Sequence, residues 1–458
     1  MNQKAKIWIK TPVGLTDSVE IGEAVKQGTV FAVKLCCSTT GNINTKGRSA
    51  IVFLTPNLSI SAIIFVDDIM GIGDRETVMK IMKNCVQMEI EKKWEFSIEK
   101  SNWMVMKTGK RGEEIKDIKV NIKQGEIKKA TTYKYLGNWV NEEANMDEQL
   151  KMMENRIGVL VKETDLIAGK EAVGKMEVSA KILLYERAVF QTMFYNIEAW
   201  TNLRKSDEDR LEIIQGKLLK KLLKLPKSTP YWGVLIELGI WPVKWQIVYR
   251  KLMLLHNLQH SDDERTAKQV INEQKNNNEK ECWYSEVKEL MCCLEIEKDP
   301  VDAMKPEWKR IVKEAIKKKV HEEAEEKKKS MKKLRFVGEH GRKSYLDEMD
   351  GDEIREVMMI KLNMIMTIGG NIGREQKCMI CQTSNETTEH VLQCTDTVNG
   401  DKLTTDCLLS TDKQILRKVL KLFKSYEERR EKIANSASQD DGQQEDQRTD
   451  LTKEQEKR

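Results

Sequence analysis

Two adjacent aspartates, Asp67 and Asp68, are the residues of this sequence that point most directly to chemistry. They follow the apolar run Ile60 to Val66 and precede a second apolar stretch that ends at Gly73. Two carboxylates at the end of a buried strand would repel each other and lose hydration, so the pattern favours the tip of a β-hairpin, in water or beside a divalent cation. Mg²⁺ takes one or two protein carboxylates and completes its octahedron with phosphate and water, as in phosphoryl transfer. The alternative is an Asp-Asp turn without an ion, because Asp is a favoured turn residue.

A second group of possible ligands combines three cysteines and a histidine, namely Cys378, Cys381, His390 and Cys394. The two-residue gap of the first pair lets both sulfurs face one ion, and the four-residue step from His390 to Cys394 places them on one face of a helical turn. Such a set completes the tetrahedral shell of a structural Zn²⁺ and leaves no position open for catalysis. The alternative is a set of reduced core thiols. The other cysteines show no such spacing: Cys36, Cys37, Cys85, Cys282, Cys292, Cys293 and Cys407.

The elements that must position the aspartates belong to a first part of mixed α and β character. Short apolar runs separated by turn signals such as Thr55-Pro56-Asn57 predict strands. Behind the aspartates, residues Glu76 to Trp94 have the periodicity of a helix, and Asp74 is a suitable acidic cap. The apolar face expected for this helix contains Val78, Ile81, Met82, Cys85, Val86 and Ile90.

From about Met146 onward the pattern is mainly helical. The predicted helices are Leu150 to Ile167, Ser179 to Trp200, Asp207 to Leu225, Glu237 to Leu258 and Trp308 to Arg335, the last with a salt-bridged exposed face. Trp241-Pro242 marks a helix start or a kink. Residues His260 to Lys280 are expected to form a loop or a frayed helix. The tail after about Ser425 has almost no apolar residues, which predicts disorder.

The composition limits the classes of protein that remain. The 458 residues contain 78 Lys and Arg against 73 Asp and Glu, and the length suggests two to four domains. The sequence shows neither a secretory signal nor an apolar run near the roughly 20 residues that span a bilayer, so we expect no membrane partner and a location in the nucleus or cytoplasm. The small net charge of +5 means that nucleic acid would have to bind local basic faces. Lys217 to Leu225 predicts such a face, on a helix that either follows a phosphate backbone or is simply solvated.

Four short motifs in this order resemble the reverse transcriptase of non-LTR retrotransposons (LINE elements). Phe65-Val66-Asp67-Asp68 is similar to the catalytic hairpin of that family, and Val25 to Thr29 is similar to its template-supporting segment. Phe96 to Ser101 resembles the strand and Lys-Ser pair behind the palm helix, and Tyr133 to Gly137 resembles the primer-grip hairpin. The Cys/His group resembles the CCHC knuckle that follows the polymerase, and the similarity covers residues 1 to 395.

The resemblance implies a role for individual residues. Asp67 and Asp68 would be catalytic ligands of Mg²⁺, and the primer grip would contain Tyr135, Leu136 and Gly137. Contacts with template or nucleotide would come from Lys26, Gln27, Gly28 and Lys100. The partners implied are an RNA template and a DNA primer.

One part of the family pattern is missing from the sequence. The palm needs a further metal-binding Asp on a strand before the Lys-Gln-Gly segment, but only 25 residues precede Lys26, and Asp17, Glu20 and Glu23 are expected to lie in a connector. We therefore expect a truncated LINE-type reverse transcriptase, an RNA-directed DNA polymerase that is catalytically incomplete as an isolated chain. The alternatives are a non-catalytic remnant that binds RNA or DNA and a helical interaction protein without selected activity.

The expected fold is α+β, with an incomplete antiparallel palm at the front. Its expected parts are a partial palm (1–140), a helical thumb (141–260), a charged helical connector (261–343), a CCHC zinc module (344–400), and a helix with a disordered charged tail (401–458).

Overall fold

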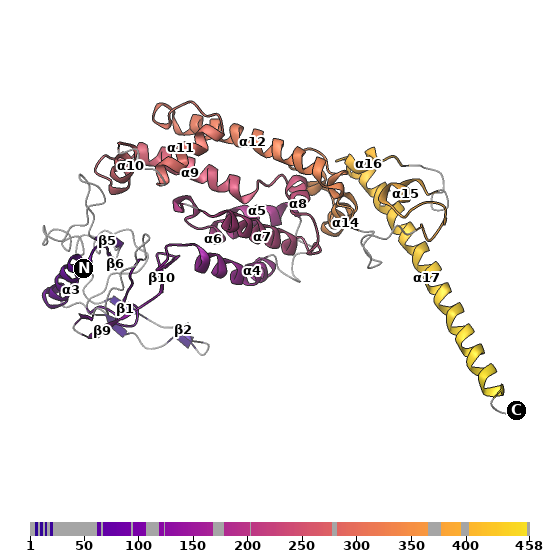
Figure 1. The fold of residues 1–458 in the computed structure, drawn as a ribbon, viewed down its shortest axis with the longest axis horizontal. Helices are drawn as coiled ribbons and strands as arrows, with labels where there is room; N and C mark the ends of the chain where they lie inside the picture. Colours follow the sequence, from indigo (N-terminus) through magenta and orange to yellow (C-terminus); the bar gives the residue numbers. More distant parts are fainter. Residues whose placement is uncertain are drawn as a thin grey trace. The chain divides into compact units, whose positions relative to one another are not determined.

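The fold is α+β, with short strands near the N-terminus and helices over most of the remaining chain (Figure 1). The computed structural model describes residues 5–7, 10–11, 14–15, 19–21, 62–65, 67–92, 95–106, 119–122, 124–167, 178–201, 203–276, 282–364, 377–394 and 403–455. The chain divides into two compact units. The α+β class expected from the sequence is therefore confirmed.

The first unit contains residues 1–134, 140–145 and 263–277 and is built from short strands around a helix. Its antiparallel pairs are β1 (Ala5–Ile7) with β4 (Val19–Ile21), β2 (Lys10–Thr11) with β3 (Gly14–Leu15), and β5 (Ala62–Phe65) with β6 (Asp68–Gly71). A three-stranded sheet has β9 (Gly125–Lys129) at its centre, antiparallel to β8 (Val120–Ile122) and parallel to β7 (Asn102–Trp103). The helix α10 (Thr266–Asn276) also belongs to this unit and forms where a loop or frayed helix was expected.

Helix α3 (Arg75–Lys92) covers the β8 side of this sheet. Asp74 Oδ1 accepts a hydrogen bond from Thr77 N at 2.8 Å, which confirms the predicted cap. The predicted apolar face was wrong at Ile90, which is exposed, whereas Glu89 is buried. The reason is that Glu89 Oε1 accepts a hydrogen bond from Phe96 N at 2.8 Å and so holds the chain that follows the helix.

The second unit contains residues 135–139, 146–262 and 278–458 and is helical. Its α-helices are α4 (Asp147–Ile167), α5 (Val178–Leu184), α6 (Phe190–Met193), α7 (Lys205–Leu222), α8 (Tyr231–Leu238), α9 (Val243–Gln259), α11 (Trp283–Cys293), α12 (Lys305–Ser330), α13 (Tyr345–Glu348), α14 (Gly351–Lys361), α15 (Thr388–Gln393), α16 (Asp406–Leu409) and α17 (Lys413–Gln455). Short turns η1 (Tyr185–Val189), η2 (Ile197–Ala199), η3 (Pro300–Asp302) and η4 (Lys332–Leu334) join them. One hydrophobic cluster extends from Leu150 to Tyr426, so the segments expected as thumb and zinc module share a core.

Two of the predicted helices are interrupted in the structure. The stretch from Ser179 to Trp200 contains the π-helical turn η1, and its last α-helical residue is Met193; Asn196, with φ 59°, then turns the chain into η2. The stretch that starts at Glu237 is split because Gly239, with φ 70°, ends α8. A Cβ at Gly239 would lie 2.3 Å from Arg342 N, so the close approach of another segment requires a glycine here.

The prediction for helix α12 is confirmed, whereas the disorder predicted for the stretch that forms helix α17 was wrong. On α12, Trp308, Val312 and Ile316 form part of a buried stripe, while ion pairs such as Arg310–Glu314 lie on its exposed face, as expected. The stretch after Ser425, for which composition predicted disorder, continues as helix α17 to Gln455 (yellow in Figure 1). Within the described residues, no helix is long and apolar enough to cross a membrane.

A buried charged pair joins three helices of the second unit. Lys361 Nζ on α14 lies 3.5 Å from Glu237 Oε2 on α8, and their side chains are 1% and 0% exposed. Tyr345 on α13 donates its hydroxyl hydrogen to the same carboxylate at 2.5 Å, and Lys361 Nζ also donates to Ser410 O. Such a pair is held by its hydrogen bonds, because each charge has lost its water.

Candidate metal sites and nucleic-acid surface

The paired aspartates lie at the tip of the β5–β6 hairpin. Phe65 is the register partner of Asp68, and Asp67 lies in the turn between the strands. Both aspartates are exposed, so their carboxylates keep the access to water that two adjacent charges need. The hairpin-tip position expected from the sequence is confirmed.

Two further motif segments meet within the first unit, which also contains the aspartates. Tyr133, on β10 (Thr132–Tyr135), donates its hydroxyl hydrogen to the backbone oxygen of Lys100 at 2.8 Å. Burial and, second, the negative charge of Asp68 raise the pKa of the Tyr133 phenol. The Lys100 side chain itself is exposed, on a turn in which Ser101 N donates to Ser97 O at 3.0 Å. The structure thus joins the segments of Lys100 and Tyr133, which lie 33 residues apart in the chain.

The acidic group at the hairpin tip is limited to the two aspartates as far as the structure describes the chain. Among the described residues, the only group of three or more His, Cys, Asp or Glu that could share an ion is the Cys/His set. Glu20, expected in a connector, instead lies on strand β4 opposite Lys6 of β1. Asp17 and Glu23 lie outside the described residues, as do the predicted template contacts Lys26, Gln27 and Gly28.

The predicted primer-grip motif also forms a hairpin. Strand β10 ends at Tyr135, and β11 (Asn138–Asn141) begins after the two-residue turn Leu136-Gly137. Both turn residues have positive φ, 45° for Leu136 and 89° for Gly137, which is the requirement of a type I′ turn. The hairpin shape is thereby confirmed for Tyr135, Leu136 and Gly137, and a Cβ at Gly137 would lie 3.2 Å from Tyr195 Cε1.

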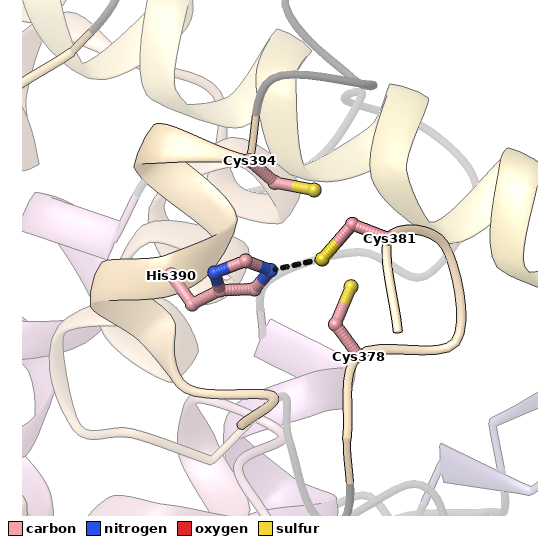
Figure 2. A group of neighbouring side chains, drawn as sticks. All are labelled: Cys378, Cys381, His390 and Cys394. Carbon is pink, nitrogen blue, oxygen red and sulfur yellow. Dashed lines mark hydrogen bonds between the residues drawn. The ribbon is translucent and has the colours of Figure 1, made fainter. Parts of the chain in front are cut away.

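The Cys/His group converges on one point in the second unit (Figure 2). The possible ligand atoms of Cys378, Cys381, His390 and Cys394 all lie within 4.8 Å of one another, so together they could hold a metal ion. Cys378 and Cys394 are buried, whereas Cys381 and His390 are partly exposed. The predicted ligand set is therefore assembled in space.

Local structure explains why these four side chains meet. Cys378 N donates to Ser384 O at 2.8 Å and Gln382 N donates to Cys378 O at 2.9 Å, which closes a tight turn around the first two cysteines. Thr387 caps α15 by accepting the N–H of His390 at 3.1 Å, so the imidazole lies on the first turn. Cys394 follows the last residue of the same short helix.

Hydrogen bonds prepare one of the thiols for metal binding. Thr383 donates its hydroxyl hydrogen to Cys381 Sγ at 3.1 Å, and His390 Nε2 lies 3.2 Å from the same sulfur. The side chain and the backbone N–H of Thr383 lower the pKa of Cys381 to about 6. Since the thiolate is the ligand form of cysteine, this environment favours a metal over a plain core thiol.

Residues around the cysteines include some that sequence reasoning did not find. Tyr426 Oη, on α17, lies 3.3 Å from Cys378 Sγ and donates to Glu386 Oε1 at 2.6 Å. Arg430, one turn further along α17, pairs with the same carboxylate at 3.3 Å. No local pattern marks Tyr426, because 48 residues separate it from Cys378 and it lies in a highly charged stretch.

A row of lysines lies along the exposed side of α7 and the turn that follows it. We define the α7 lysine row as Lys217, Lys221 and Lys224, all exposed and, among the described residues, without an acidic partner at ion-pair distance. The opposite side packs Leu218, Leu219 and Leu222 into the core, which confirms the amphipathic pattern. Arg355 of α14 adds a further cation near the row, since its Nε donates to Lys224 O at 2.9 Å.

Comparison of the chain with protein-family models, with curated proteins and with solved structures gives no match. Function is therefore inferred from the motifs and from the three arrangements above: the aspartate hairpin with its neighbours, the Cys/His group and the α7 lysine row.

Proposed function

We propose that this protein is a reverse transcriptase of the non-LTR retrotransposon type, with a palm in the first unit and a thumb and zinc knuckle in the second. The observation that supports this most strongly is the β5–β6 hairpin with Asp67 and Asp68 at its tip. The segments of Lys100 and Tyr133, which belong to two other motifs of that family, are hydrogen-bonded to each other in the same unit, and the charge of Asp68 acts on the Tyr133 phenol.

The two aspartates are proposed to bind one Mg²⁺, weakly. Carboxylate oxygens are the ligands that Mg²⁺ prefers, and the ion fills its remaining positions with water and phosphate. Two-metal phosphoryl transfer also needs a carboxylate that bridges the ions. Because no third acid of the described residues joins the pair, we expect the chain to be catalytically incomplete by itself.

The Cys/His group is proposed to bind a structural Zn²⁺. Three thiolates and one imidazole are the ligands of a closed tetrahedral zinc site, and the turn and the short helix supply them in the usual order. The metal would fasten this turn to α15 at the border of the large core. No reaction is assigned to it.

A primer-extension assay tests the polymerase part of the proposal. The full chain, Mg²⁺, dNTPs and an RNA template with an annealed DNA primer should give no more product than the variant Asp67→Ala. Template-dependent product that Asp67→Ala and Asp68→Ala both abolish would show a complete active site and overturn the expected incompleteness. The matched control Asp74→Ala removes an acid from the same unit that only caps α3.

The second candidate function is binding of RNA or DNA without catalysis, and the α7 lysine row is the observation that favours it. Neutralising phosphates releases counterions, so affinity must fall steeply with salt if the lysines contact a backbone. Filter binding of a primer–template duplex over a series of salt concentrations measures this slope. An absence of binding near physiological salt would leave only the third possibility, a helical interaction protein.

A further inference from the structure

The Tyr426 hydroxyl occupies a position between the metal ligands and a buried acid. Its oxygen lies 3.3 Å from Cys378 Sγ and 2.6 Å from Glu386 Oε1, and its side chain is buried, as is that of Cys378. Tyr426 belongs to α17, whereas Cys378 and Glu386 flank the turn of the Cys/His group. The contact therefore connects the metal site to a helix that supplies no ligand.

The hydrogens available at this contact are too few for both acceptors once a metal is bound. A phenol has a single hydrogen, and an ionised carboxylate only accepts, so in the arrangement seen here Tyr426 donates to Glu386. The Cys378 thiol can then donate its own hydrogen to Tyr426 Oη. A metal-bound Cys378 is a thiolate that has given up this hydrogen and can only accept.

Glu386 has a second hydrogen-bond donor, so it can lose the hydrogen bond from Tyr426 and still be paired. Arg430 Nε lies 3.3 Å from Glu386 Oε1, with side-chain exposures of 20% for Arg430 and 7% for Glu386. If the tyrosine hydrogen leaves Glu386, the carboxylate remains paired with the guanidinium. The buried sulfur of Cys378, by contrast, lies within hydrogen-bond distance of the Tyr426 hydroxyl.

We propose that Tyr426 is a positioning residue for the metal: when Zn²⁺ binds, its hydroxyl turns from Glu386 to Cys378 Sγ and donates to the metal-bound thiolate. The inference rests on the proposed zinc site and adds α17 to it. The reorientation stabilises the thiolate and holds α17 against the metal turn, so that zinc occupancy and docking of α17 favour each other.

The test compares zinc affinity in variants of the full chain. Metal is removed with EDTA, and Zn²⁺ is returned in competition with a chromophoric chelator. Tyr426→Phe keeps the buried ring and removes only the hydroxyl, so it should still bind one zinc per chain but about 10- to 100-fold more weakly, the usual effect of losing an outer-shell partner. The matched control is Tyr185→Phe, which removes a different buried hydroxyl, bonded to Gln215, and should bind zinc like the unaltered chain.

A second variant separates this role from simple support of the fold. Glu386→Gln replaces the competing acceptor with a weaker one, so the hydroxyl becomes freer to donate to the thiolate. Its zinc affinity should equal or exceed that of the unaltered chain. A loss as large as that of Tyr426→Phe would overturn the proposed reorientation.

Cobalt substitution gives a readout at the sulfur itself. The thiolate-to-Co²⁺ charge-transfer band should shift in Tyr426→Phe and not in Tyr185→Phe. Equal zinc affinity and equal cobalt spectra in Tyr426→Phe and the unaltered chain would overturn the role of Tyr426 while leaving the zinc site intact. Failure of the unaltered chain to bind zinc at all would instead overturn the zinc site.

Discussion

Single side chains determine what the two candidate metal sites can bind. Asp67 and Asp68 are exposed at the tip of a hairpin, an arrangement suited to a weakly held, hydrated cation. Cys378 and Cys394 lie in the core, and the depressed pKa of Cys381 supplies a thiolate. The first site is therefore expected to exchange its ion readily, whereas the second should hold its ion as part of the fold.

Removal of zinc should destabilise the second unit. Two of the four ligands are buried in its large core, so binding energy at the site becomes folding energy. At free zinc of about 100 times the dissociation constant, the expected stabilisation is about 2.7 kcal/mol. Thermal unfolding followed by far-UV circular dichroism should show a lower Tm with chelator, restored by Zn²⁺ and not by Mg²⁺. An unchanged Tm in Cys394→Ser and in chelator would contradict this.

Breaking the buried pair Glu237–Lys361 should cost more than breaking any surface pair. Lys361→Met leaves the Glu237 carboxylate in the core without its cation. This should lower the free energy of unfolding by about 3–5 kcal/mol. Urea unfolding measures this, and the double variant Glu237→Gln/Lys361→Met should recover most of it. The control Arg310→Ala removes a pair exposed on both sides and should cost less than about 1 kcal/mol.

At the scale of elements, two hairpins and one short helix present the candidate site residues. Hairpin β5–β6 exposes the aspartates, hairpin β10–β11 carries the half-buried Leu136 and the exposed Gly137 in its turn, and α15 orients His390. The β10–β11 turn departs from the residues that its geometry prefers, since a type I′ turn favours Asn-Gly and this one has Leu136 at φ 45°. A residue that is unfavourable for its turn is expected where the turn has a role beyond folding.

Replacing Leu136 with Asn should therefore separate stability from binding. Asn tolerates positive φ better than Leu, so Leu136→Asn should raise the free energy of unfolding by roughly 0.5–1 kcal/mol. If the turn contacts a primer, the same variant should bind the primer–template duplex more weakly. Gly137→Val is the opposite control: it should lower the free energy of unfolding, because φ at this position is 89° and the added Cβ would meet Tyr195. A Leu136→Asn chain that is less stable would refute the strain at this turn.

At the scale of the whole molecule, the net charge of +5 is too small to attract nucleic acid without local concentration. The α7 lysine row supplies such a concentration within the second unit, and α7 is held in place by its leucine face. Much of the remaining charge is paired, as along α12, where Lys319 and Lys328 each contact a glutamate. The unpaired row is thus a better candidate for phosphate contact than the more highly charged α12.

Changing the α7 lysine row should reduce both the affinity for nucleic acid and the dependence of that affinity on salt. In the variant Lys217→Ala/Lys221→Ala/Lys224→Ala, each lost phosphate contact should flatten the slope of log affinity against log salt by about 0.9 on duplex DNA or 0.7 on single strands. The matched control replaces three lysines of α12, Lys317, Lys318 and Lys319, and should change the slope less. Filter binding at several salt concentrations decides between them, and equal slopes for both variants would remove the row from the binding surface.

The amino-acid sequence alone determined the features that depend on neighbouring residues. The hairpin tip at Asp67-Asp68, the cap at Asp74, the four members of the Cys/His group and the amphipathic pattern of α7 all follow from short-range spacing, because turn chemistry, capping and helical periodicity act over a few residues.

The tertiary structure alone decided which distant residues meet. Glu89 rather than Ile90 became buried because Phe96 N needed a partner, and Gly239 ended a helix where a Cβ would lie 2.3 Å from Arg342 N of another segment. Likewise, Tyr133 reaches the segment of Lys100, and Tyr426 reaches Cys378. These contacts result from packing between elements far apart in the chain, and no local periodicity encodes them.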